Sequence, residues 1–243
     1  VPAGLNHLPT APGFGNVDAL HRAMLKDADL RVLVERFSVE ADAGTRYALS
    51  EAILRRWAQT GDIGGLRGEM DAGELATLES FWGQQAPRAE PVGDYALRLH
   101  AAYEDLHRHV HGLLSLQTHY RDYYQLIGFS GEEGGNWQGD YRQFAATVAA
   151  DYADGKLDDS VLGDLLTSIQ GLDPDDQRHL HNAVHDLNAA AALLPESRRT
   201  DFLSIVWRGD DDIRLADDET DINTYAGNDK VQGNARDNQL EGG

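Results

Sequence analysis

The residues of greatest chemical interest lie in the last part of the chain, residues 201–243. Aliphatic residues recur there every nine positions, at Ile213, Ile222, Val231 and Leu240. Two positions before each of them stands a polar residue: Asp211, Thr220, Asp229 and Asn238. Two positions earlier again lie Gly209, Asp218, Gly227 and Arg236. A constant nine-residue period of this kind predicts a repeated unit of one turn and one short strand.

Aspartate and glycine in such turns favour the binding of a hard cation. Carboxylate and carbonyl oxygens are the ligands that Ca²⁺ prefers, and glycine permits tight turns that face carbonyls inward. The frame Gly-x-Asp-x-aliphatic is complete in the repeats that open at Gly209 and Gly227 and degraded in the other two. A short strand with one apolar residue cannot offset a chain entropy of roughly 1–2 kcal/mol per ordered residue. We therefore predict that bound calcium stabilises this segment.

This segment resembles the nonapeptide G-G-x-G-x-D-x-U-x of repeats-in-toxin (RTX), or haemolysin-type, calcium-binding proteins. The resemblance covers residues 209–243, where Gly233, Gly242 and Gly243 take positions that open a repeat. It implies a parallel β-roll in which successive turns lie on opposite edges, so that stacked turns are 18 residues apart. One edge would then hold the better calcium site, formed by Asp211, Asp229, Gly209 and Gly227. The other edge, with Asp218 and Asn238, would bind weakly or not at all, because its stacked pair Thr220 and Asn238 has no carboxylate.

The RTX resemblance also implies a location. Proteins of this group leave the cell by type I secretion, so we expect a secreted, extracellular or cell-surface protein. Extracellular modules bind calcium at about 10⁻⁴–10⁻³ M, and export would therefore act as the folding switch. The chain begins with Val1 and stops where a new repeat would open, so we expect it to be a fragment of a longer protein.

The composition of the chain agrees with a cation-binding protein. The formal charge is −20 and there is no cysteine. Such acidity disfavours nucleic acid as a partner, because a binder must neutralise phosphates with Lys and Arg. Disulfides and zinc–thiolate sites are excluded, and no apolar run reaches the roughly 18 residues of a transmembrane segment. Acidity that serves only solubility remains an open alternative.

Residues 1–200 show helical periodicity, and these helices would have to position the repeats. Apolar residues at helical spacing predict helices around residues 30–37, 49–57 and 75–82. A long helix is predicted over residues 94–127, with an apolar stripe at Leu99, Tyr103, Leu106, Val110 and Leu113. Further helices are expected at 140–153, from 158 to Gly171, and from Asp173 and Pro174 to a point before Pro195. Connectors are expected at residues 84–93 and 128–139.

The charge changes sharply near residue 200. Residues 201–243 carry 11 acidic and 4 basic residues, a net charge of −7, which leaves −13 for the first 200 residues. We therefore predict a mainly α fold: an antiparallel helical bundle over 1–200, followed by the first turns of a short parallel β-roll over 201–243.

The helical part resembles a helical domain that precedes the repeats in large iron-regulated and haemolysin-like proteins. The likeness lies in residues 20–37, 53–58, 67–83 and 102–114. It transfers no catalytic residue. Its position implies a cap that covers the open end of the roll, since terminal units of solenoids need one.

Histidines offer an alternative chemistry in the helical part. His100, Glu104, His107 and His111 fall on one line of the long helix, and His181 and His185 are four residues apart on another. Imidazole and carboxylate suit zinc or iron. Each of these histidines, however, follows a residue of the apolar stripe, so we expect them to flank the core.

Catalytic motifs are absent from the sequence. There is no G-x-S-x-G and no H-E-x-x-H, so we predict no catalytic residue and no enzyme. Asp173-Pro174 fits a helix start better than a self-cleavage site. The sequence therefore favours a calcium-binding structural or interaction module of a secreted RTX adhesin- or toxin-like bacterial protein, whose partners are calcium ions and a protein or cell surface. The alternative is a helical effector or enzyme domain carried by an RTX secretion module.

Overall fold

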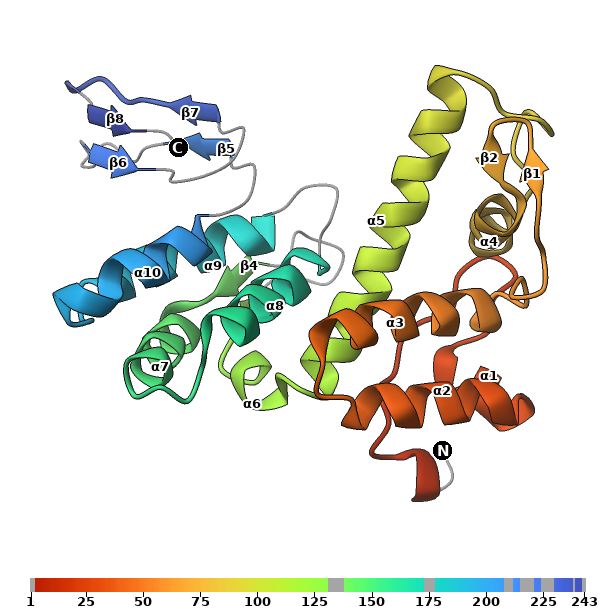
Figure 1. Ribbon diagram of the computed structural model, residues 1–243, viewed down its shortest axis with the longest axis horizontal. Coiled ribbons are helices and arrows are strands. Elements are labelled where there is room, and N and C mark those ends of the chain that lie inside the picture. The colour runs from red at the N-terminus through yellow and green to blue at the C-terminus, as the bar shows by residue number, and fades with distance from the viewer. Residues whose placement is uncertain are drawn as a thin grey trace. The chain divides into compact units, whose positions relative to one another are not determined.

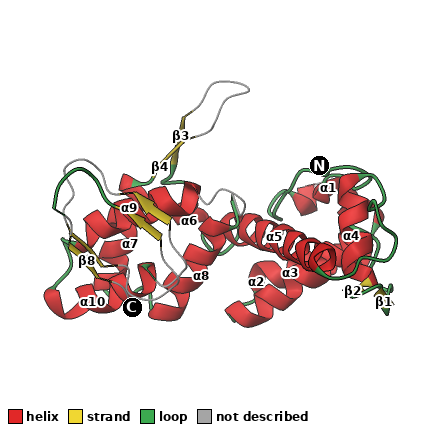
Figure 2. Ribbon diagram, turned by 90° about the horizontal axis from the view of Figure 1, so that it is seen from above, coloured by secondary structure: helices red, strands yellow, loops and turns green. Residues whose placement is uncertain are grey.

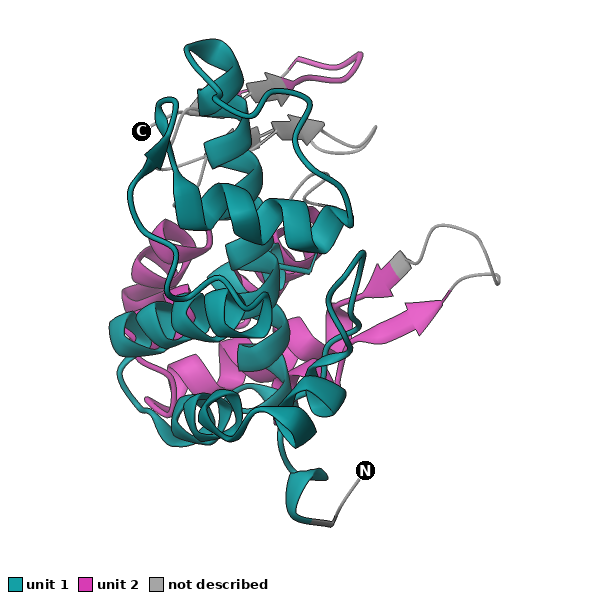
Figure 3. Ribbon diagram, turned by 90° about the vertical axis from the view of Figure 1, so that its right-hand side faces the viewer, with its two compact units in different colours: residues 1–121, 167–176 teal, residues 122–166, 177–243 magenta. Residues whose placement is uncertain are grey.

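The computed structural model describes residues 3–130, 138–172, 178–207, 212–214, 221–223, 230–237 and 239–241. The described residues are mainly helical, which confirms the prediction of a mainly helical protein. The strands are all short, as the yellow segments of Figure 2 illustrate. The chain divides into two compact units, residues 1–121 with 167–176 and residues 122–166 with 177–243 (Figure 3).

Five α-helices and a short hairpin form most of the first unit (Figure 1). Three of the helices begin at an aspartate whose carboxylate accepts backbone N–H groups of the first turn, namely Asp27, Asp42 and Asp71. Such N-caps satisfy donors that the helix itself leaves unpaired. The elements are η1 (Ala3–Leu5), α1 (Leu20–Lys26), α2 (Ala28–Val39), α3 (Ala43–Trp57), α4 (Ala72–Trp82) and α5 (Asp94–Gln117), with the antiparallel strands β1 (Leu66–Arg67) and β2 (Met70–Asp71) between α3 and α4.

The core of the first unit lies where α3 packs against α2 and α5, and where α4 packs against α5. Helical spacing puts the large apolar side chains of each helix on one face. Fully buried members of this core are Leu30, Val34, Phe37, Ile53, Leu54, Leu75 and Leu114. The helices predicted around 30–37, 49–57 and 75–82 are therefore confirmed.

The long helix α5 ends ten residues earlier than the sequence predicts. It stops at Gln117, and the short helix α6 (Arg121–Tyr124) follows. The end is set by contacts from far along the chain, because the Gln117 side chain exchanges hydrogen bonds with the backbone of Thr10 at 2.9 and 2.7 Å. The hydroxyl of Thr118 donates to the Leu114 carbonyl at 2.7 Å and caps the last turn.

The second unit contains α7 (Arg142–Ala153), α8 (Asp159–Gln170) except its residues 167–170, α9 (Arg178–Ala191) and α10 (Glu196–Val206). The first three match predicted helices, although the expected start of α9 at Asp173-Pro174 lies outside the described residues. The last, α10, was not predicted, and it continues past residue 200, where the charge changes. The loop expected over 128–139 is wrong at its ends, since β3 (Gly128–Ser130) pairs antiparallel with β4 (Gln138–Asp140).

Aromatic and aliphatic residues form the core of the second unit, where α9 packs against α7 and α10. The rings of Tyr152 and Phe202 meet edge to face, with centroids 5.1 Å apart. The hydroxyl of Tyr152 donates to Asp159 at 2.8 Å, and the guanidinium of Arg198 lies over the Tyr152 ring. Buried Tyr therefore fastens the start of α8 and the start of α10 to α7.

Four strands of three residues each close the described chain. They are β5 (Asp212–Arg214), β6 (Asp221–Asn223), β7 (Lys230–Gln232) and β8 (Gln239–Glu241). Each strand pairs with the next but one: β5 is parallel to β7, and β6 is parallel to β8 (Figure 1). Two separate two-stranded parallel sheets result.

Candidate functional site

The nine-residue period of the sequence coincides with the C-terminal strands. Each aliphatic residue of the period is the middle residue of one strand. In the paired strands Ile213 stands opposite Val231 and Ile222 opposite Leu240. Partners are thus 18 residues apart, the spacing that the RTX resemblance implies for stacked turns. Parallel pairing of such short strands leaves only a few hydrogen bonds in each sheet.

The predicted calcium ligands themselves fall outside the described residues. This holds for all six: Asp211, Asp229, Gly209, Gly227, Asp218 and Asn238. Their neighbours in sequence are described, however. Asp212 stands opposite Lys230, and these two residues directly follow Asp211 and Asp229.

One turn of the repeated segment is described, between β7 and β8. Its backbone N–H at Arg236 donates to the side-chain oxygen of Asn234 at 2.9 Å. Asparagine commonly closes turns in this way, by binding the backbone two residues further on. An asparagine thus closes the one described turn of the repeated segment.

Two of the singled-out histidines lie inside the first unit rather than beside its core. His107 and His111 of α5 are 2% and 1% exposed. The Nε2 atom of His107 lies 2.9 Å from the hydroxyl of Ser50 on α3, and the Nδ1 atom of His111 lies 3.2 Å from the same hydroxyl. The expectation that these histidines flank the core is wrong, because Ser50 provides the polar partner that makes their burial tolerable.

His100 and His185 have separate partners near the surface, whereas the Nε2 atom of His181 is buried with no hydrogen-bond partner among the described residues. His100 lies 2.9 Å from a carboxylate oxygen of Glu74, and His185 lies 3.2 Å from that of Asp186. Over the described ranges no three His, Cys, Asp or Glu side chains come together in a way that could hold a metal ion. The geometry therefore gives no support to a zinc or iron site within those ranges.

Ser50 and His107 have the residue types of a nucleophile and its base, but their surroundings do not suit catalysis. Ser50 is fully buried, and its hydroxyl donates to the Tyr47 carbonyl at 2.7 Å. A nucleophile must reach a substrate and be within reach of its base. The contact is therefore a structural one. Ser50 was not among the residues singled out from the sequence, although its position between Leu49 and Ile53 put a polar residue on an apolar stripe.

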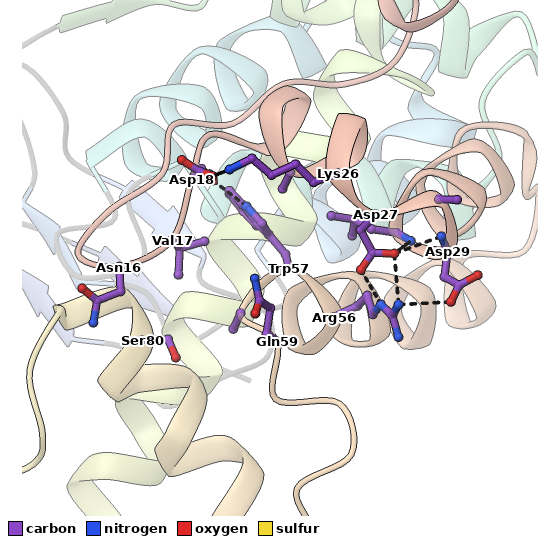
Figure 4. A pocket seen from close by; sticks show the side chains of 14 residues that line it. Asn16, Val17, Asp18, Lys26, Asp27, Asp29, Arg56, Trp57, Gln59 and Ser80 are labelled. Atoms are coloured by element: carbon purple, nitrogen blue, oxygen red, sulfur yellow. Dashed lines mark hydrogen bonds and ion pairs between the residues drawn. The ribbon is translucent and has the colours of Figure 1, made fainter.

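A polar pocket of about 610 Å³ opens at the junction of α1, α2 and the end of α3 (Figure 4). Arg56 binds the carboxylate of Asp27 through two hydrogen bonds, of 2.6 and 3.0 Å, and reaches Asp29 at 3.1 Å. On the other side Lys26 pairs with Asp18 at 2.5 Å. Every charged side chain that lines the pocket is held in an ion pair. The hydrogen bonds from Arg56, offset in part by desolvation, also keep the pKa of Asp27 below its ordinary value.

Comparison with family models, with curated proteins and with solved structures finds no match. Among the described helices, none is long and apolar enough to cross a membrane.

Proposed function

We propose that this chain is a calcium-binding structural or interaction module of a secreted RTX-type protein. In this proposal the C-terminal strands are the first turns of a calcium-stabilised β-roll, and the helical part caps the roll and presents a surface to a protein or cell-surface partner. The observation that carries the proposal is the parallel pairing of strands whose central residues are 18 positions apart.

The pairing pattern supports a roll rather than a hairpin or a simple solenoid. Neighbouring strands in sequence, such as β5 and β6, lie in different sheets, and pairing skips one repeat each time. A chain that alternates between two sheets must turn at both edges, once every nine residues. Those turns are where the sequence places its aspartates and glycines.

The energetics of this segment call for a ligand. A strand of three residues with one aliphatic side chain buries little apolar surface. Each Å² of buried apolar surface contributes only about 25 cal/mol to stability. Ordering its backbone costs roughly 1–2 kcal/mol per residue. The net charge of −7 over residues 201–243 adds repulsion between carboxylates. A divalent cation bound by carboxylate and carbonyl oxygens would remove that repulsion and cross-link successive turns.

The two edges of the proposed roll differ in their expected affinity. Extending the register of β5 and β7 by one residue would set Asp211 opposite Asp229, with Gly209 and Gly227 nearby to supply carbonyls. Extending the register of β6 and β8 by one residue would set Thr220 opposite Asn238 on the other edge. The carboxylate of the repeat frame on that edge is Asp218. We therefore assign the stronger site to the first edge.

A calcium titration followed by circular dichroism and thermal unfolding tests the proposal. We expect added β-structure and a higher melting temperature at millimolar calcium, and a much smaller response to magnesium. The double variant Asp211→Asn, Asp229→Asn should lose most of the response to calcium. Thr220→Ala with Asn238→Ala, on the other edge, should keep it.

The control for lost negative charge is Glu196→Gln with Asp201→Asn, because both residues are exposed on α10 and the net charge changes equally. This control should respond to calcium as the unaltered chain does. An unaltered chain that gains neither β-structure nor thermal stability at 10 mM calcium would refute the proposal. So would an unchanged response in the Asp211, Asp229 double variant.

A further inference from the structure

A buried hydrogen-bonded cluster joins α5 to α3 in the first unit. The Nε2 atom of His107 lies 2.9 Å from the Ser50 hydroxyl and 3.2 Å from the Tyr47 carbonyl oxygen. The Tyr47 ring packs against the imidazole of His107 at a tilt of 41°, with centroids 4.2 Å apart. One imidazole thus contacts both the backbone and the side chains of the facing helix.

The partners of His107 determine which nitrogen carries its proton. The Tyr47 carbonyl can only accept a hydrogen bond. The Ser50 hydroxyl uses its own hydrogen to donate to that same carbonyl, at 2.7 Å. Nε2 of His107 must therefore bear hydrogen and donate. The neutral ring already makes both hydrogen bonds to α3 through Nε2. A second proton, on Nδ1, would charge the buried ring and add no hydrogen bond to α3.

The charged and titratable groups around this ring come from both helices. The nearby carboxylates of Glu51 and Glu104 favour a charged imidazole, whereas burial and the neighbouring His111 oppose it. Desolvation is the largest of these effects, and it holds the pKa of His107 below its ordinary value of 6.5. Beside His111, α2 contributes the uncharged ring of Phe37. The titratable groups that act on His107 are thus Glu51 of α3 and Glu104 and His111 of α5, with the Tyr47 ring of α3 packed against the imidazole.

We propose that His107, Ser50 and Tyr47 form a proton-sensitive latch between α3 and α5, which holds the first unit closed while His107 is neutral and loosens it when mild acid protonates the ring. The latch is a property of the helical part and does not rest on the proposed calcium site.

The sign of the pH dependence follows from the direction of the shift. Because the folded state disfavours protonated His107, the stability that the neutral ring provides is complete above pH 6.5, the ordinary value. It is lost as the pH falls from there toward the lower pKa of the folded state. In that window the equilibrium constant for opening rises by up to about tenfold per pH unit.

His107→Gln is the informative variant, because the Gln Nε2 amide can still donate to Ser50 and Tyr47 but cannot take up a proton. Hydrogen exchange of the α3 and α5 amides, corrected for intrinsic rates, should be compared at pH 7.5 and 5.5. The unaltered chain should lose up to about tenfold in protection on acidification. His107→Gln should lose markedly less.

His100→Gln provides a matched control on the same helix. The hydrogen bond to Glu74 raises the pKa of His100, so protonation of His100 stabilises the fold where protonation of His107 destabilises it. The effect of His100 on stability is small because its side chain is 54% exposed. This control should lose protection as the unaltered chain does. Equal loss of protection in the unaltered chain and in His107→Gln would overturn the proposal.

A ring titration of the unaltered chain, by NMR of ¹³C-labelled histidine, keeps the test decisive even where His107→Gln does not fold. The His107 ring should stay neutral to a pH clearly below the midpoint of His100. A His107 midpoint at or above 6.5 would refute the latch.

Discussion

The helical core of the first unit and the C-terminal strands are stabilised in different ways. Around α3, side chains such as Phe37, Ile53 and Leu54 are completely buried, and three helices begin at aspartate caps. The strands β5 to β8 have three residues each, and every one pairs with a partner 18 positions away. Local hydrogen bonds and apolar burial thus suffice to stabilise the helices. Pairing of the strands requires the closure of loops, which costs entropy, and such short strands bury little apolar surface to offset that cost.

This contrast teaches where an ion can act as a switch. A segment whose folding free energy is near zero responds strongly to a ligand that binds only its folded form. A well-packed helical core does not need such a ligand. Calcium should therefore order the strands and leave the helices unchanged, and substitutions in the helical core should act independently of calcium.

The largest expected effect comes from emptying the helical core. Phe37 is fully buried and its ring contacts His111 and His119. Phe37→Ala should lower the free energy of unfolding by about 3–5 kcal/mol. Urea denaturation followed at 222 nm should give this loss both in EDTA and in calcium. A loss that calcium restores would contradict the separation of the two regions.

A smaller effect is expected where two backbones touch. A Cβ atom on Gly112 of α5 would lie 2.5 Å from the Ser168 carbonyl oxygen and 2.9 Å from the Gly171 Cα atom. Gly112→Ala should therefore cost about 1–3 kcal/mol through overpacking. Gly163→Ala is the control, since a Cβ there has open space within α8, and it should stabilise by roughly 0.5–1 kcal/mol. Equal effects of the two substitutions in chemical denaturation would show that the close approach is not real.

The smallest effect concerns the end of α3. Gln59 has a positive φ of 60°, and Thr60 N–H donates back to the Arg55 carbonyl at 2.8 Å. Glycine usually occupies this left-handed position after a helix. Gln59→Gly should raise stability by up to about 1 kcal/mol. Gly83→Ala, at the equivalent end of α4 with φ 70°, should lower it. A destabilised Gln59→Gly variant in thermal unfolding would speak against this interpretation of the helix end.

The sequence predicted those parts of the fold that repeat a local pattern. Helical spacing located α2, α3 and α4, and the nine-residue period located the central residue of each C-terminal strand. The apolar residues of each helix share one face, and the aliphatic residues of the nine-residue period are the middle residues of the four strands. The 18-residue pairing came from the resemblance to RTX repeats, because a period alone does not say which repeats pair.

Features that depend on distant partners were not predictable. The end of α5 depends on Gln117 meeting Thr10, and the burial of His107 depends on Ser50 of another helix. Hydropathy counts histidine and serine as polar, so it assigned them to the surface. The calcium ligands predicted from the sequence lie outside the described residues. The described strands show only the pairing register next to those ligands.

Hydrogen exchange measured across the whole chain, with and without calcium, distinguishes the strands from the helices in a single experiment. We predict that millimolar calcium protects amides of residues 212–214, 221–223, 230–232 and 239–241, and leaves those of α2, α3 and α5 unchanged. The prediction is wrong if calcium leaves the exchange of the strand amides unchanged. It is also wrong if protection rises equally in the helices.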